Sequence, residues 1–64
     1  MITIKFHTKD FIKIVYWPAV PDKDERVDID GEAYRVTYRV WYINDNDTQE
    51  VESYVEVGLV KYFA

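Results

Sequence analysis

The chain has 64 residues, enough for one small domain spanning residues 1–64 but not for a large hydrophobic core. It contains no cysteine, so disulfide bonds and cysteine-based zinc sites are excluded, and its aromatic content of 17% indicates reinforcement by ring packing, by oligomerisation, or by both. The net charge of −4 argues against a partner such as nucleic acid, whose phosphates are bound by clustered Lys and Arg.

The hydropathy pattern gives no sign of a membrane segment. A membrane-spanning helix needs a run of about 18 apolar residues, and the sequence has none. The first residues alternate as a strand does, without the charged and apolar regions of a leader peptide. We therefore expect an intracellular protein without membrane contact, located in the cytoplasm, including that of a host cell, or in a virion.

The chain begins with two amphipathic strands, residues 1–7 and 11–17, separated by a three-residue hairpin loop. Pairing Ile4 with Ile14 aligns the apolar residues of both strands on one face, which we expect to be buried. These apolar residues are Ile2, Ile4, Phe6, Ile12, Ile14 and Tyr16.

A connector and a second hairpin follow. Pro18 ends the second strand because proline cannot donate to a strand ladder, and residues 18–26 read as a solvated loop. Asp30 and Gly31 are typical of a type I′ turn, which needs positive φ at both central residues. In such a hairpin Ile29 faces Glu32.

Residues 33–43 read AYRVTYRVWYI, and their regular alternation predicts a strand buried on one face. The predicted core positions are Tyr34, Val36, Tyr38, Val40 and Tyr42. After a polar turn at residues 44–48, the last strand would place Val55 opposite Tyr38. Gly58 interrupts its alternation, so we expect a bend there.

These elements predict an all-β fold, because five short strands with tight turns leave no segment of helical period. A small twisted sheet buries one face by curling on itself. We expect a small antiparallel five-stranded barrel of the SH3-like kind, with an open curved meander as the alternative.

The odd-numbered face of residues 35–41 is the candidate contact surface. Arg35, Arg39 and Trp41, with Tyr54 from the paired strand, are residue types enriched at interface hot spots, and Trp17 is a further aromatic candidate. The alternative is a solvated face on which arginines and glutamates form salt bridges of small individual value.

The sequence offers little for catalysis. His7 is the only histidine and Ser53 the only serine, so neither a Ser-His nor a Cys-His pair is supported, and we expect no enzyme, catalytic residue or cofactor. Residues 45–47 resemble the start of a calcium loop but lack its later glycine and glutamate, so no metal site is predicted. The remaining acidic residues favour solubility, with imitation of DNA phosphates as the alternative.

Residues 21–41 resemble a pattern in short uncharacterised proteins of bacteriophages and prophages, V-x-I-x-G-x-x-Y-x-V. It is carried here by Val27, Ile29, Gly31, Tyr34 and Val36. The resemblance implies a viral or prophage accessory protein and supplies no catalytic residues.

We therefore expect a non-catalytic protein-binding module that contacts a host or viral protein, as an inhibitor or an assembly accessory. The first alternative is a structural homo-oligomeric subunit, in the simplest case a homodimer, because a sheet that does not close leaves edge groups that a second copy can pair with. The second is a small barrel that binds single-stranded nucleic acid through exposed aromatic residues.

Overall fold

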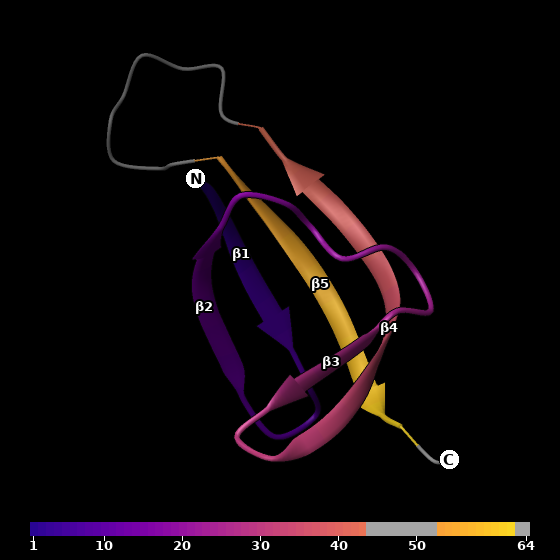
Figure 1. Cartoon of the computed structure of the whole chain (residues 1–64). Coiled ribbons are helices and arrows are strands. Elements are labelled where there is room, and N and C mark those ends of the chain that lie inside the picture. Colours follow the sequence, from indigo (N-terminus) through magenta and orange to yellow (C-terminus); the bar gives the residue numbers. More distant parts are fainter. Residues whose placement is uncertain (44–52, 63–64) are drawn as a thin grey trace.

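The computed structural model describes residues 1–43 and 53–62 and contains one curled sheet, which forms a half-barrel (Figure 1). Its strands are β1 (Ile2–His7), β2 (Ile12–Trp17), β3 (Arg26–Ile29), β4 (Glu32–Tyr42) and β5 (Tyr54–Lys61). The spatial order is β2-β1-β5-β4-β3. The prediction of a five-stranded all-β domain is confirmed. The sheet is mixed rather than antiparallel throughout, because β1 and β5 pair in parallel.

The inner, concave face of the sheet holds the core. Trp17 packs edge-on against Phe6, with ring centroids 5.3 Å apart, and Val20 of the connector packs against the same cluster. Full burial of an aliphatic or aromatic side chain contributes about 1.5–3 kcal/mol, so this cluster is the main source of stability. Its buried members are Ile4, Phe6, Val27, Ile29, Tyr34, Val36, Val55, Val57 and Leu59.

The β1–β2 hairpin has a register one residue away from the predicted one. Ile4 faces Val15 instead of Ile14. A shift of one residue exchanges the two faces of a strand, so the prediction that Ile12, Ile14 and Tyr16 belong to the core is wrong. They lie on the outer face, and Val15 packs against the core in their place.

The turn between β1 and β2 causes this shift. The Thr8 hydroxyl oxygen accepts hydrogen bonds from the amides of Asp10 and Phe11 at 3.1 and 3.0 Å, and the Thr8 amide donates to the Phe11 carbonyl at 2.9 Å. Thr8 and Phe11 are therefore a bonded pair that closes a tight turn, in place of the predicted three-residue loop. This side-chain capping replaces the glycine that such turns often use.

The β3–β4 hairpin confirms its predicted register. Ile29 faces Glu32, and both Asp30 and Gly31 have positive φ, 51° and 85°, as a type I′ turn requires. The connector then continues this pairing beyond β3, since the amide of Asp24 donates to the carbonyl of Val36 at 2.8 Å. The connector thereby runs from the end of β2 across to β4 (Figure 1).

β4 contains a bulge at Thr37. Val36 pairs with Leu59, but Tyr38 pairs with Gly58, so two steps along β4 match one step along β5. The Thr37 hydroxyl donates to the Gly58 carbonyl at 3.1 Å and holds the bulge in place. The irregularity expected at Gly58 thus occurs opposite it, in the neighbouring strand.

The bulge changes which face the β4 side chains occupy. Tyr34 and Val36 precede it and are buried, as predicted. Tyr38, Val40 and Tyr42 follow it and lie on the outer face, with 42%, 39% and 43% of their surfaces exposed. The prediction that all the even positions are core is therefore wrong beyond Val36, because the extra residue reverses the alternation.

Candidate protein-contact surface

The structure divides the predicted contact residues between the two faces of the sheet. Arg35 and Tyr54 lie on the outer face, whereas Arg39 and Trp41 lie on the inner side, opposite β5 residues of the core. Trp17 is also on the inner side, at the β2 edge. The prediction that Arg35, Arg39 and Trp41 share one face is wrong, because the β4 bulge separates the first from the other two.

Both of these arginines bind carboxylates of the connector. An Arg35 Nη1 atom lies 3.1 Å from Asp24 Oδ1, and an Arg39 Nη1 atom lies 3.3 Å from Asp22 Oδ1. All four side chains are at least one-third exposed, so each pair contributes at most about 1 kcal/mol. The two ion pairs hold the connector against β4. They also engage the two arginine charges that the sequence analysis expects to contact a partner.

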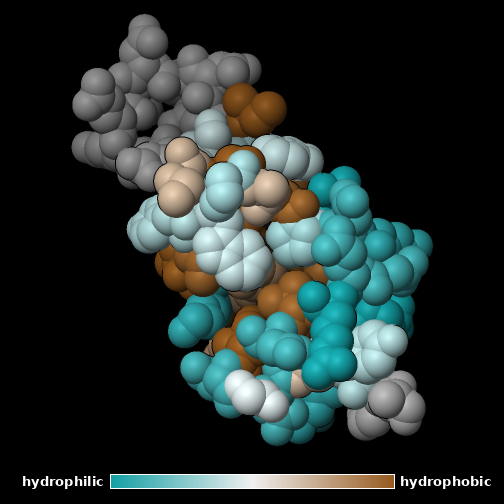
Figure 2. Space-filling view, in the orientation of Figure 1, coloured by the Kyte–Doolittle hydropathy of each residue, from teal (hydrophilic) through white to brown (hydrophobic). Residues whose placement is uncertain are grey.

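The outer face carries two apolar rows on different strands. We call Ile12, Ile14 and Tyr16 the β2 strip, and Tyr38, Val40 and Tyr42 the β4 strip. Polar side chains of β1 and β5 lie between the strips. In the space-filling view, hydrophobic side chains reach the surface on the β2 side, while hydrophilic ones gather over the connector on the opposite side (Figure 2).

Two aromatic side chains of the β4 strip contact residues of the neighbouring strand β5. The Tyr38 hydroxyl donates to Glu56 Oε2 at 2.7 Å, and the Tyr38 ring fills the space where a side chain on Gly58 would begin. The Tyr42 ring stacks on that of Tyr54 at 4.8 Å between centroids. The hydrogen bond to Glu56, with a smaller effect of burial, raises the pKa of Tyr38 above its ordinary value. These half-exposed aromatics therefore have structural roles.

The polar side chains between the two strips connect β1 to β5. Lys5 Nζ lies 3.9 Å from the centroid of the Tyr54 ring, a cation–π contact, and His7 Nε2 lies 3.5 Å from Glu56 Oε1. Within residues 1–43 and 53–62, no group of three or more His, Asp or Glu side chains is arranged to hold a metal ion. Residues 45–47, the calcium-loop candidate, lie outside the described residues.

The β2 strip differs because, among residues 1–43 and 53–62, no further strand lies along the outer edge of β2. Its side chains are 61%, 51% and 62% exposed in chain order, and β2 is the last strand on its side of the sheet. In an antiparallel pair, residues alternate between bonding their neighbour and pointing away from it. Since Phe11 bonds Thr8, residues 13, 15 and 17 face β1, and residues 12, 14 and 16 direct their N–H and C=O groups to the free edge.

The strip therefore combines exposed apolar side chains with backbone groups that no other strand of the described chain pairs. The sequence pattern does not predict this surface, because the expected hairpin register places these residues in the core. The sequence does contain a signal for the observed register. Val15 and Trp17 are apolar as well, so either register of the β1–β2 hairpin would bury a largely apolar face of β2.

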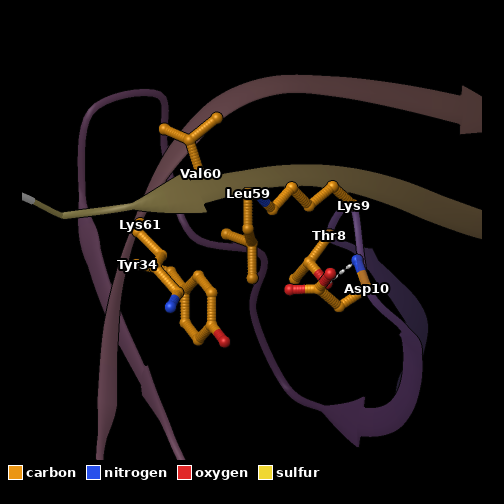
Figure 3. Close-up of a pocket in the computed structure, with 7 residues that line it drawn as sticks. All are labelled: Thr8, Lys9, Asp10, Tyr34, Leu59, Val60 and Lys61. Atoms are coloured by element: carbon orange, nitrogen blue, oxygen red, sulfur yellow. Dashed lines mark hydrogen bonds between the residues drawn. The ribbon is translucent and has the colours of Figure 1, made fainter.

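Two hollows accompany these surfaces. One, of about 210 Å³, is smaller than the usual sites for drug-sized ligands, and Leu59 separates Tyr34 on one side from Thr8 and Asp10 on the other (Figure 3). Its lining is Thr8, Lys9, Asp10, Tyr34, Leu59, Val60 and Lys61. The other, of about 340 Å³, adjoins Ile2, Trp41 and Val55. Trp41 thus lines a shallow apolar depression at one end of the sheet.

In the part of the chain that the structure describes, no helix is long and apolar enough to cross a membrane. Comparison of the sequence and structure with protein-family models, curated proteins and solved structures finds no match.

Proposed function

We propose that this chain is a non-catalytic protein-binding module, a half-barrel of the SH3-like kind that contacts a host or viral protein, as an inhibitor or an assembly accessory of phage type. The observation that supports this function is the β2 strip, where exposed apolar side chains lie on a free strand edge. Contiguous apolar surface of this kind marks interaction sites, and free edges accept strands from partners.

Binding proceeds by addition of a strand to the sheet. A partner segment lying beside β2 bonds the outward N–H and C=O groups of Ile12, Ile14 and Tyr16, and this supplies affinity without regard to sequence. The partner's own side chains cover the β2 strip. Each main-chain hydrogen bond contributes on the order of 1 kcal/mol, so several together with apolar burial hold an extended segment.

A displayed library of random extended peptides tests this function. We expect selected ligands to shift the amide NMR signals of Ile12, Ile14 and Tyr16. The variant Ile14→Lys should bind the same ligands at least about tenfold more weakly, because the charged side chain removes apolar contact at the centre of the strip.

Val40→Lys is the matched control. Val40 is an exposed apolar residue of the same outer face, 39% accessible, but it belongs to β4. This variant should bind as the parent does. The proposal fails if selected ligands bind Ile14→Lys as tightly as the parent, or if they shift signals of another surface. Self-association that Ile14→Lys abolishes, without any peptide binding, would favour the homo-oligomeric subunit instead.

A further inference from the structure

Charge is distributed unevenly along the chain. Residues 1–21, which form the β1–β2 hairpin and the start of the connector, carry three lysines and one aspartate. Residues 22–64 carry five basic and eleven acidic side chains. The free edge of β2 therefore lies in the basic part of a protein that is acidic overall.

Lys13 places this positive charge on the edge strand itself. It lies on the inner side of β2, between Val15 and the hairpin tip, and is exposed. Within the described chain, Lys13 forms no ion pair, in contrast to Arg35 and Arg39, whose charges the connector occupies. Lys9 adds a second exposed ammonium group at the hairpin tip.

We propose that the free edge of β2 binds an extended segment of another protein in which apolar residues alternate with acidic ones. The inference rests on the proposed function and names the chemistry of the partner. Successive side chains of a strand point to opposite faces. The apolar residues of the segment therefore lie beside the β2 strip on the outer face, and an acidic residue lies beside Lys13 on the inner side.

Charge argues against a second copy of this chain as the occupant. Antiparallel pairing of β2 with β2 of another copy, centred on Ile14, would place Lys13 of each copy opposite Val15 of the other, so that the two lysines lie diagonally across neighbouring strands of two positively charged hairpins. Like charges at neighbouring positions across strands are destabilising. An acidic segment replaces this repulsion with attraction.

Two synthetic peptides with blocked ends test the proposal. They share the same apolar residues at alternate positions and carry glutamate or lysine at the positions between. We expect the glutamate peptide to shift the amide signals of Ile12, Ile14 and Tyr16 and to slow their hydrogen exchange. It should bind about fivefold or more tightly than the lysine peptide, the ratio that one or two exposed ion pairs produce.

Charge reversal on the protein gives the decisive comparison. Lys13→Glu should reverse the preference, so that the lysine peptide binds more tightly than the glutamate peptide. Lys23→Glu makes the same change of net charge in the connector and should leave the order unchanged, which distinguishes a local contact from the overall field.

The other outcomes overturn the inference in distinguishable ways. Equal binding of both peptides at β2 removes the acidic partner but leaves the protein-binding function intact. If neither peptide shifts the β2 signals while ligands from the displayed library do, the alternating pattern is wrong and the function stands. An equal effect of Lys13→Glu and Lys23→Glu shows that the charge acts at long range. Concentration-dependent protection of the β2 amides without peptide shows that a second copy is the occupant.

Discussion

At the scale of single residues, Gly58 determines how β4 lies against β5. A Cβ atom built on Gly58 would lie 1.9 Å from Cε2 of the Tyr38 ring, far inside van der Waals contact. The ring covers a glycine in the neighbouring strand, an arrangement that compensates for the missing side chain. Because Tyr38 is the first residue after the bulge, this contact also sets the face that the following side chains occupy.

We predict that Gly58→Ala destabilises the fold by about 1 kcal/mol, because the Tyr38 ring must leave its position and its hydrogen bond to Glu56. The pKa of Tyr38 should fall towards the ordinary tyrosine value of about 10, since that bond is the main cause of its elevation. Urea unfolding measures the stability, and NMR titration of the Tyr38 ring measures the pKa.

The pH dependence follows from the direction of this shift. A folded-state pKa above the unfolded value means that the bond stabilises the fold at and below neutral pH. This contribution is lost as the pH rises from the ordinary value of about 10 through the raised value. Gly58→Ala should therefore reduce the alkaline loss of stability.

Two comparisons make the Gly58 prediction specific. Gly31→Ala changes a glycine with a φ of 85° and no atoms within 4 Å of the added carbon. It should cost about 1 kcal/mol through backbone strain and leave the pKa of Tyr38 unchanged. In a Tyr38→Ala background, Gly58→Ala should be neutral or stabilising. An equal cost of Gly58→Ala in both backgrounds would show that the ring does not occupy the site.

At the scale of secondary-structure elements, a turn decides which face of β2 is buried. The Thr8 hydroxyl bonds two amides of the turn, and these bonds select the register that buries Val15 and exposes Ile14. Since both faces of residues 12–17 are largely apolar, hydrophobic burial alone does not discriminate strongly between the two registers.

We predict that Thr8→Val, which keeps the shape of the side chain but removes its acceptor, destabilises the fold by about 1 kcal/mol. Thr3→Val, on the outer face of β1, should be neutral or slightly stabilising, because valine is at least as well suited to a strand. Urea unfolding compares the two variants. A cost of Thr8→Val no greater than that of Thr3→Val would mean that the turn bonds do not set the register.

The two hairpins show what the sequence can predict at this scale. The Asp30–Gly31 turn was predictable because its positive φ values demand particular residues, and its register followed from the turn length. The Thr8 turn depends on a threonine hydroxyl, a weaker signal, and its register was predicted wrongly. Alternation also cannot encode a bulge, because Thr37 fits the polar positions of an uninterrupted strand equally well.

The prediction of the contact surface failed for the same two reasons, an unpredicted bulge in β4 and a wrong register of the β1–β2 hairpin. Strict alternation along β4 places Arg39 and Trp41 on the same face as Arg35, because the bulge at Thr37 has no signal in the sequence. The β2 strip was assigned to the core through the wrong register. Among the predicted contact residues, the arginines and tryptophans are exposed, whereas Tyr54 is only partly exposed. The grouping of these side chains depends on two backbone features that individual side chains, Thr8 and Thr37, stabilise.

At the scale of the whole molecule, the half-barrel has two edges with different protection. The β3 edge is short, and its exposed Arg26 and Asp28 form an ion pair at 2.9 Å between Nε and Oδ1. Short length and charge are common ways in which proteins discourage pairing at an edge. The β2 edge is longer, carries Lys13 as its only charged residue, and exposes the β2 strip. A surface kept in this form is either used in binding or a liability.

The liability itself can be measured on the isolated protein. An exposed apolar edge promotes association between chains, and a charge placed within it blocks that pairing. We predict that Ile14→Lys raises the protein concentration at which light scattering increases on prolonged incubation, by about twofold or more relative to the parent. Val40→Lys changes the net charge equally on the β4 strip and should have a smaller effect. Equal protection by both variants would attribute association to net charge, and the β2 edge would then lose its special status.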